Sequence, residues 1–384
     1  MLLLKNALIN DAINPIPYKA DILIDDLKIK QISNNIEVNE AVQIIDLDSL
    51  SVYPGFVEAH CHMGLHGYGV GFEGQDINEK NDIITPELRG LDSINPQDPT
   101  FELAANAGIT CVCAGPGSTN VLGGTFSVLK TVGNCVDKMI VRRDAAMKCA
   151  FGENPKTYYK EKCNYTRMST AAKLREMLFK AQEYKEDFDN YNAGTGDKPT
   201  FDMKLNALLP VIEKKIPLKA HAHRADDICT AIRIAKEFDI LLTIEHCTEG
   251  HLIVDVLSEC GYPIAVGPTL THASKFELRN KSWETAGILS KAGCQVSIIT
   301  DSPVVPEEYL PLCAGYAVKA GMDPFEALKA ITINPAKHIG VDDMVGTLEV
   351  GKDADIVVTD GDPFVSSTNV KLTIINGEVV YSQK

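Results

Sequence analysis

Eight short apolar runs, several of them separated by helical stretches, dominate the sequence between residues 52 and 303. The runs occupy residues 53–62, 108–117, 125–133, 145–153, 216–223, 240–247, 262–268 and 294–303. The helical stretches include residues 170–188 and 225–238. Apolar strands that alternate with helices are typical of βα units and a parallel sheet, and eight of them over about 250 residues predict a closed (β/α)8 TIM barrel, an α/β fold. The third run, 125–133, fits this pattern least well.

Both ends of the chain have a different pattern. They contain short apolar or alternating runs with turns between them, and Asn376-Gly377 is a typical hairpin turn. Each end is too short to form a domain alone, and chain termini often lie close together. We therefore predict one small sheet domain formed by residues 1–51 and 345–384, and a catalytic barrel domain of residues 52–344.

Charge and composition exclude some classes of function. The net charge of −15 argues against binding to nucleic acid or to an anionic membrane surface, because both attract basic patches. The eleven cysteines show no CxxC pair, which is typical of reduced thiols. Residues 1–13 have no basic start and no small-residue cleavage site, and no apolar run reaches the roughly 18 residues of a membrane span. We expect a soluble, cytoplasmic protein with a small-molecule substrate.

Polar residues stand at the carboxyl ends of five predicted barrel strands. They are His60 and His62 (first run), Glu153 (fourth), His221 and His223 (fifth), His246 (sixth) and Asp301 (eighth). Strand ends of this kind meet at the mouth of a barrel, where barrel enzymes build their sites. A single histidine there is more often a structural residue, and a single aspartate a helix cap. Together, however, imidazole and carboxylate groups predict a divalent metal site, with zinc, manganese and iron all acceptable.

Several motifs together resemble the amidohydrolase superfamily, in particular its imidazolonepropionase-like and prolidase-like branch. The motifs are PGFVEAHCH, HAHRADDI, IEHCTEGH, ITDSPV, ALKAITINPAKHIGV and GTLEVGKDADIVVTDGDPF. The resemblance spans nearly the whole chain. It implies a metal-bearing (β/α)8 barrel with a small β-sandwich built from both termini, in a homo-oligomer.

The resemblance also implies roles for the residues at the strand ends. His60 and His62 would hold a first metal, and His221 and His246 a second, with zinc as the expected ion in both positions. Asp301 would ligate the first metal and take a proton from the bridging water. A carboxylate at this position has its pKa lowered by nearby cations, so it can start the reaction as a base.

The ligand that bridges two metals in this superfamily usually comes from the fourth strand. It is commonly a carboxylated lysine and sometimes a glutamate. We predict Glu153 as the bridge, because Lys148 would lie deeper in the strand.

Three further residues are expected to contact the substrate. His223 shares a face with His221, and His272 follows the seventh run. Arg224 could hold a substrate carboxylate through a bidentate pair, although a salt bridge to Asp226 or Asp227 is an equal alternative. The glycine-rich stretch 115–126 could cradle an anion through its backbone N–H groups.

These residues predict a metal-dependent hydrolase of a carbon–nitrogen amide bond, in a cyclic amide, a dipeptide or an N-acyl amino acid. Deaminases of the superfamily commonly have a glutamate where this chain has Arg224, which disfavours the first alternative, a deaminase of a ring amidine. The second alternative is a non-catalytic binding or scaffold protein on the same fold. Substrate specificity is expected in two stretches without clear periodicity, 63–99 and 154–170.

Overall fold

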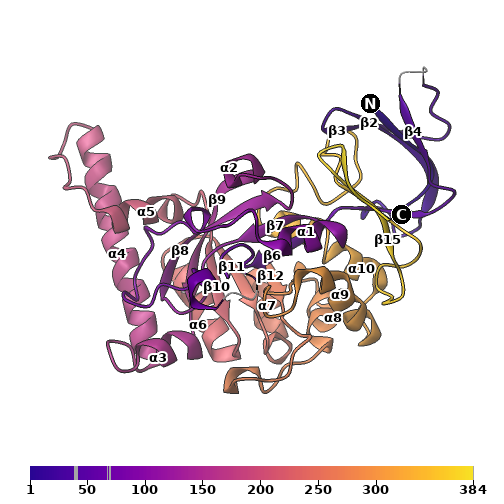
Figure 1. Cartoon of the computed structure of the whole chain (residues 1–384). Coiled ribbons are helices and arrows are strands. Elements are labelled where there is room, and N and C mark those ends of the chain that lie inside the picture. The colour runs from indigo at the N-terminus through magenta and orange to yellow at the C-terminus, as the bar shows by residue number, and fades with distance from the viewer. Residues whose placement is uncertain (39–41, 67, 69–70, 384) are drawn as a thin grey trace.

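A computed structural model describes residues 1–38, 42–66, 68 and 71–383, which form two sheets (Figure 1). The barrel sheet has the order β13-β12-β11-β10-β9-β8-β7-β6. Its strands are β6 (Phe56–Cys61), β7 (Ile109–Ala114), β8 (Leu122–Lys130), β9 (Ile140–Ala150), β10 (Leu218–Ala222), β11 (Leu242–His246), β12 (Ile264–Val266) and β13 (Val296–Ile298). All eight coincide with the predicted apolar runs, and strands buried on both faces read as such runs. The predicted fold class is confirmed.

The third barrel strand runs against the others. β8 pairs antiparallel with β7 and with β9, whereas all other neighbouring strands of this sheet pair in parallel. Only residues 115–121 connect β7 to β8. A parallel crossover needs about a dozen residues or more, so this short connection allows only a reversed strand. The expectation of a fully parallel sheet is therefore wrong at this one position.

The two edge strands of the sheet, β6 and β13, approach each other and nearly close the barrel. The backbone N–H of His62 donates to the carbonyl of Ser302, at 2.8 Å. The Glu58 carboxylate accepts the backbone N–H of Thr300, also at 2.8 Å. Helix α11 (Ile333–His338) packs against both edge strands. The carboxyl ends of the first and last strands therefore lie side by side, which brings residues 60–62 to residues 300–302.

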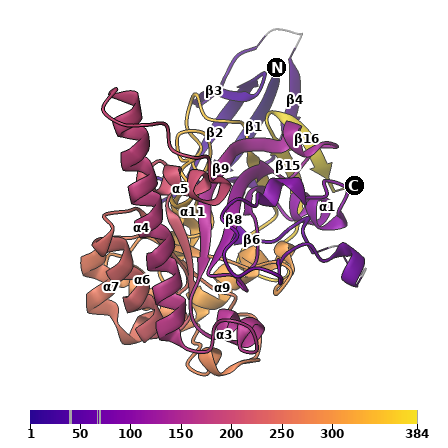
Figure 2. The same cartoon turned by 90° about the vertical axis from the view of Figure 1, so that its left-hand side faces the viewer.

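Helices cover the outside of the barrel (Figures 1 and 2). Besides α11 they are α1 (Pro99–Asn106), α2 (Val136–Met139), α3 (Glu153–Tyr159), α4 (Arg167–Asn192), α5 (Met203–Ile212), α6 (Ala225–Glu237), α7 (Val254–Cys260), α8 (Glu284–Lys291), α9 (Leu310–Lys319) and α10 (Pro324–Lys329). The amino-terminal half of α4 packs on the barrel and its other half projects beyond it. Among the described residues no helix has the length and apolar character needed to cross a bilayer.

The two stretches without periodicity differ in structure. The described part of residues 63–98 contains only the 3-10 turns η1 (Phe72–Gly74) and η2 (Gly90–Asp92). The stretch 154–170 is instead mostly helical, because α3 ends at Tyr159 and α4 begins at Arg167. Pro155 lies in the first turn of α3, where a proline is tolerated. The start of α4 is closed by a capping box between Thr166 and Ser169.

The second sheet combines both ends of the chain. Its strands are β1 (Leu2–Ile9), β2 (Tyr18–Asp25), β3 (Lys28–Ser33), β4 (Gln43–Asp46), β5 (Ser51–Pro54), β14 (Ile356–Thr359), β15 (Val370–Ile375) and β16 (Glu378–Ser382). The order is β16-β15-β14-β5-β1-β2-β3, and β4 also pairs with β1. This sheet has an apolar core of its own, which includes Leu4, Ile22 and Ile356. Because β5 lies in this sheet, the sheet extends three residues past the predicted boundary at residue 51.

Candidate metal centre

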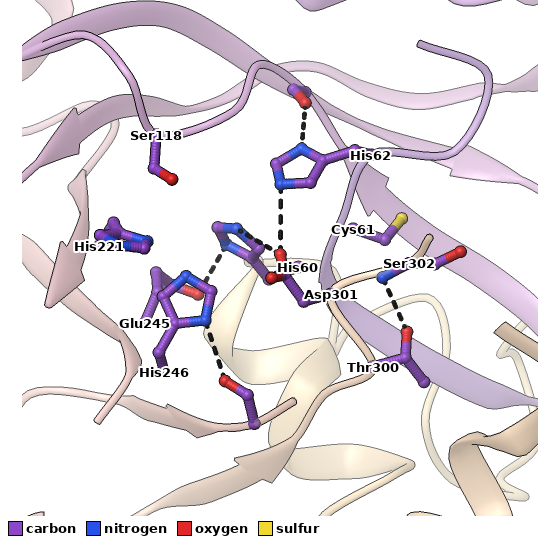
Figure 3. A network of polar contacts seen from close by, with 12 residues as sticks. His60, Cys61, His62, Ser118, His221, Glu245, His246, Thr300, Asp301 and Ser302 are labelled. Carbon is purple, nitrogen blue, oxygen red and sulfur yellow. Dashed lines mark hydrogen bonds and ion pairs between the residues drawn. The ribbon is translucent and has the colours of Figure 1, made fainter. Parts of the chain in front are cut away.

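The first cluster of site residues joins His60 of β6 and the adjacent His62 to Asp301, which follows β13 (Figure 3). Their potential ligand atoms all lie within 4.8 Å of one another. Asp301 Oδ1 is 3.2 Å from His62 Nε2 and 3.7 Å from His60 Nε2. Both imidazoles are buried. Two histidines and an aspartate that is about 240 positions away in the sequence therefore lie together.

The hydrogen bonds of the two rings fix where their lone pairs point. His62 Nδ1 lies 2.7 Å from the carbonyl oxygen of Gly115, and His60 Nδ1 lies 3.0 Å from Glu245 Oε2. Carbonyl and ionised carboxylate oxygens only accept hydrogen bonds, so Nδ1 carries the hydrogen in both rings. The lone pairs of both Nε2 atoms therefore face Asp301.

The second cluster contains His221 of β10, the adjacent His223, and His246 of β11. Here too the potential ligand atoms lie within 4.8 Å of one another. His246 Nδ1 is 2.9 Å from the carbonyl oxygen of Gly267, which leaves its Nε2 with the lone pair. The rings of His246 and His60 are 5.1 Å apart, so the two clusters adjoin.

Burial keeps four of the imidazoles in the two clusters neutral. It lowers the pKa of His60, His221 and His223 well below the ordinary value, and that of His246 to about 4. A neutral imidazole is the form that ligates a metal ion.

Three buried polar atoms in the two clusters have no hydrogen-bond partner among the described residues. They are His221 Nδ1, His246 Nε2 and Asp301 Oδ1. Buried polar atoms are nearly always paired, and lone pairs that face a carboxylate oxygen repel it unless a cation lies between them. Imidazole nitrogen and carboxylate oxygen suit zinc, manganese and iron. The donor set therefore fits a divalent cation.

Two of these residues have an unusual backbone conformation. His246 has a φ of 73° and Asp301 a φ of 54°. In a regular strand Glu245 and His246 would point to opposite faces, yet both reach His60. The left-handed turn at His246 allows both side chains to face the barrel interior. Such conformations cost about 1–3 kcal/mol and cluster at functional sites.

The ionised form of Asp301 is favoured by its surroundings. Burial alone would raise the pKa of this carboxyl, but nearby positive charge, including that of Lys148, outweighs burial and holds the pKa below the ordinary value. Asp301 is thus a carboxylate able to accept a proton.

Lys148 lies beside the first cluster, although sequence analysis chose Glu153 in its place. Its side chain is completely buried inside the barrel, and its Nζ lies 3.1 Å from His60 Nε2. Burial lowers the pKa of Lys148 to about 8, so a substantial fraction is a neutral amine near physiological pH. The available signal was a lysine in the middle of an otherwise apolar strand, where an unpaired lysine is rare.

Glu153 does not belong to either cluster in this structure. It begins α3, beyond the end of β9, and its Oε2 faces the backbone N–H of Glu277 at 3.4 Å. Its own backbone N–H donates to the Glu277 carboxylate, at 2.8 Å.

A buried ionic network around Glu245 holds the imidazole of His60 in place. Besides the imidazole of His60, the Glu245 carboxylate accepts Lys219 Nζ at 3.0 Å and His338 Nε2 at 2.8 Å. Burial would raise the pKa of Glu245, but Lys219 and His338 outweigh it and hold the pKa well below the ordinary value. Groups that orient a ligand in this way tune its affinity for metal. None of Glu245, Lys219 and His338 was identified as a site residue from the sequence.

The other residues predicted to contact substrate have different positions. His223 is in the second cluster, with its Nδ1 2.7 Å from Thr248 Oγ1. Arg224 forms a bidentate pair with the exposed Asp226, at 2.9 and 2.8 Å, which is the alternative that sequence analysis left open. His272 is exposed.

Four residues from three separate connections line the mouth beside the second cluster. They are Ser118, Asn154, Lys275 and Glu277. The buried Glu277 lies in the 3-10 turn η4 (Phe276–Leu278), and its Oε1 is 3.8 Å from both His221 Nε2 and His223 Nε2. Figure 3 shows Ser118 beside His221.

The chain is similar to known proteins of one family. The model of the amidohydrolase family matches residues 51–380. Amidohydrolase tasK of Hapsidospora irregularis is 26% identical over 90% of this chain, and the match spans only 38% of tasK. An imidazolonepropionase of Thermoplasma volcanium is 32% identical over 43% of this chain and 42% of its own length.

Solved structures agree with this comparison. An amidohydrolase from Thermotoga maritima MSB8 matches over the full length of both chains, with a TM-score of 0.96 and 40% identity. A prolidase complexed with N-methylphosphonate-L-proline also covers both chains fully, with a TM-score of 0.63 and 15% identity, and this likeness concerns the fold alone. The predicted superfamily, with its imidazolonepropionase and prolidase neighbours, is confirmed.

Proposed function

Because this chain belongs to the amidohydrolase family, we propose that it is a metal-dependent hydrolase of a carbon–nitrogen amide bond in a small molecule. The main observation behind the proposal is that two clusters of potential metal ligands lie next to each other at the barrel mouth. The candidate substrates are a cyclic amide, a dipeptide and an N-acyl amino acid. The names of two relatives, a dihydroorotase and an imidazolonepropionase, support the proposal.

We assign His60, His62 and Asp301 to a first divalent ion, and His221 and His246 to a second. Two zinc ions are the proposed complement, with manganese and iron as alternatives. His223 is close enough to join the second group or to contact substrate. Location in the cytoplasm and assembly into a homo-oligomer stay predictions.

The geometry favours Lys148 over Glu153 as the group that bridges the two ions. A neutral lysine amine can add carbon dioxide and lose a proton to give a carbamate, which offers two oxygen atoms. Lys148 Nζ already lies beside His60, whereas the Glu153 carboxylate faces the backbone of Glu277. The bridging role of Glu153 remains the competing prediction.

Bound divalent ions would supply a water that ionises near neutral pH and would polarise the scissile carbonyl. Asp301 accepts a proton from the attacking water and then passes it to the leaving nitrogen, acting as general base and then as general acid. His60 is held in place for this step by Glu245, and His62 by the carbonyl of Gly115.

Metal removal tests the proposal. Purified protein is assayed against dipeptides, N-acyl amino acids and cyclic amides before and after treatment with a chelator, and again after addition of zinc, manganese or iron. We expect hydrolysis of at least one series, a loss of at least about 100-fold on chelation and recovery with metal. Circular dichroism of the stripped protein controls for unfolding.

Two outcomes would contradict the proposal. Ammonia release from ring amidines, with every amide left intact, would favour a deaminase. Hydrolysis that is unchanged in fully metal-stripped protein would exclude a metal-dependent mechanism.

A further inference from the structure

We infer that Lys275, Ser118 and Asn154 form a binding site for a carboxylate of the substrate, close to the scissile amide. The inference rests on the proposed function and narrows it to substrates that carry a free carboxylate next to the amide nitrogen. Dipeptides and N-acyl amino acids have this arrangement, because a single carbon separates their carboxylate from the scissile nitrogen.

Asn154 holds the other two residues in place. Its Oδ1 accepts a hydrogen bond from Lys275 Nζ at 2.9 Å, and its Nδ2 donates to Ser118 Oγ at 2.7 Å. The same Nδ2 lies 3.5 Å from His221 Nε2. The three residues come from the β7–β8 connection, from α3 and from the β12–α8 connection. They therefore form a built group directly beside a proposed metal ligand.

Two donors of this group are free to contact a substrate. Lys275 has three N–H donors, and within the described part of the chain only Asn154 and Glu277 accept from it, at 2.9 and 2.8 Å. Ser118 accepts from Asn154, and its own hydroxyl hydrogen has no acceptor among the described residues. The side chain of Lys275 is 25% exposed and is therefore not sealed inside the protein.

The Glu277 carboxylate does not fully neutralise the positive charge of Lys275. The Glu277 carboxylate also accepts the backbone N–H of Glu153 at 2.8 Å and faces the imidazoles of the second cluster. One ammonium and one hydroxyl match the single charge and two oxygen atoms of a carboxylate. A phosphate dianion is typically held by more cationic groups or by arginine forks.

Arg224 is another cation near this mouth, and it is a weaker candidate. Its Nε and Nη2 donate to the two carboxylate oxygens of Asp226, at 2.9 and 2.8 Å. Its guanidinium carbon lies 6.0 Å from the centre of the exposed Phe276 ring. The two cations therefore give different predictions for the same substrates.

The test compares free acids with their amides. Wild type, Lys275→Met, Lys275→Arg, Ser118→Ala and Arg224→Met are assayed on matched panels of dipeptides and N-acetyl amino acids, each as the free carboxylate and as the carboxamide. Arg279→Met is the matched control, since Arg279 lies on the same loop and stacks on Phe276 at 4.2 Å. Metal content is measured for every variant.

We expect Lys275→Met to raise KM for free acids by about 10- to 100-fold, with kcat changed much less, because a hydrogen bond to a charged group is lost. Ser118→Ala should raise KM a few-fold, Lys275→Arg should recover part of the loss, and carboxamide hydrolysis and metal content should stay near wild type.

Three results would overturn the inference. Equal losses on acids and carboxamides in Lys275→Met would mean that Lys275 acts only through Glu277. A rise in KM in Arg224→Met instead would assign the carboxylate to Arg224. Equal wild-type activity on both panels would mean that no carboxylate is recognised while amide hydrolysis stands, whereas hydrolysis of neither panel would remove the proposed function itself.

Discussion

Replacing Asp301 by Asn is expected to lower kcat by at least about 1,000-fold while the protein keeps its fold and its metal. Asparagine has the shape of aspartate and retains one oxygen that can ligate a cation, but it cannot accept a proton. General acid–base groups contribute about 10²- to 10⁴-fold, and Asp301 would serve in both halves of the cycle. Steady-state kinetics on whichever amide the wild type hydrolyses measures the effect.

The control for this variant is Asp239→Asn, which makes the same change on a carboxylate that pairs with Lys214 at the surface. It should leave kcat within about twofold of wild type, since surface substitutions have small effects. If Asp301→Asn binds metal normally and retains more than a tenth of wild-type kcat, Asp301 is not the proton-transfer group.

Replacing Lys130 by Met is expected to destabilise the protein by about 3–5 kcal/mol. Lys130 ends β8, is almost completely buried, and donates to Asp353 at 2.9 Å and to Asp355 at 2.8 Å, which precede β14 of the terminal sheet. Burial would lower the pKa of Lys130, but the two carboxylates outweigh it and raise the pKa above the ordinary value. Methionine leaves the buried Asp355 without its cationic partner, and the loss of stability is measured by urea denaturation.

Lys28→Met is the matched control, because Lys28 pairs with the same Asp353, at 2.6 Å, but is half exposed. An exposed pair contributes about 0–1 kcal/mol. A triple variant in which Asp353→Asn and Asp355→Asn accompany Lys130→Met should recover part of the stability, because it removes the uncompensated charges. If Lys130→Met costs no more than Lys28→Met, the buried pair does not hold the barrel to the terminal sheet.

The sequence was sufficient for most of the fold because its strands are buried on both faces. Each barrel strand therefore appears as an apolar run, and the eight runs predicted the eight strands. The direction of β8 was not predictable from its own residues, because an apolar run reads the same in either direction. The length of the 115–121 connection was the available signal.

The metal-ligand candidates were predictable because they end strands. Alternation within a strand put His60 with His62 and His221 with His223, and the barrel brought these pairs together. Lys148 lies inside its strand, where sequence alone could not separate a site residue from a wall residue.

The mouth of the site was beyond prediction from sequence. Lys275 and Glu277 are on an irregular connection, whose course depends on contacts with residues more than 100 positions away, such as Asn154. The sequence offered Arg224 for a substrate carboxylate, but it could not decide between that role and a salt bridge to the neighbouring Asp226 or Asp227, and the structure has the pair with Asp226.

The proposed two-ion centre is tested most directly by the number of divalent metal ions per chain. This number is measured by elemental analysis on purified wild type and on His60→Ala, Lys148→Met and Glu153→Ala. We expect about two ions in the wild type, as in two-metal hydrolases, with fewer in His60→Ala and Lys148→Met and no change in Glu153→Ala. A loss confined to Glu153→Ala would return the bridge to Glu153. A wild-type chain that binds no metal, even when purified in the presence of zinc, would contradict the proposed metal centre and the metal-dependent reaction.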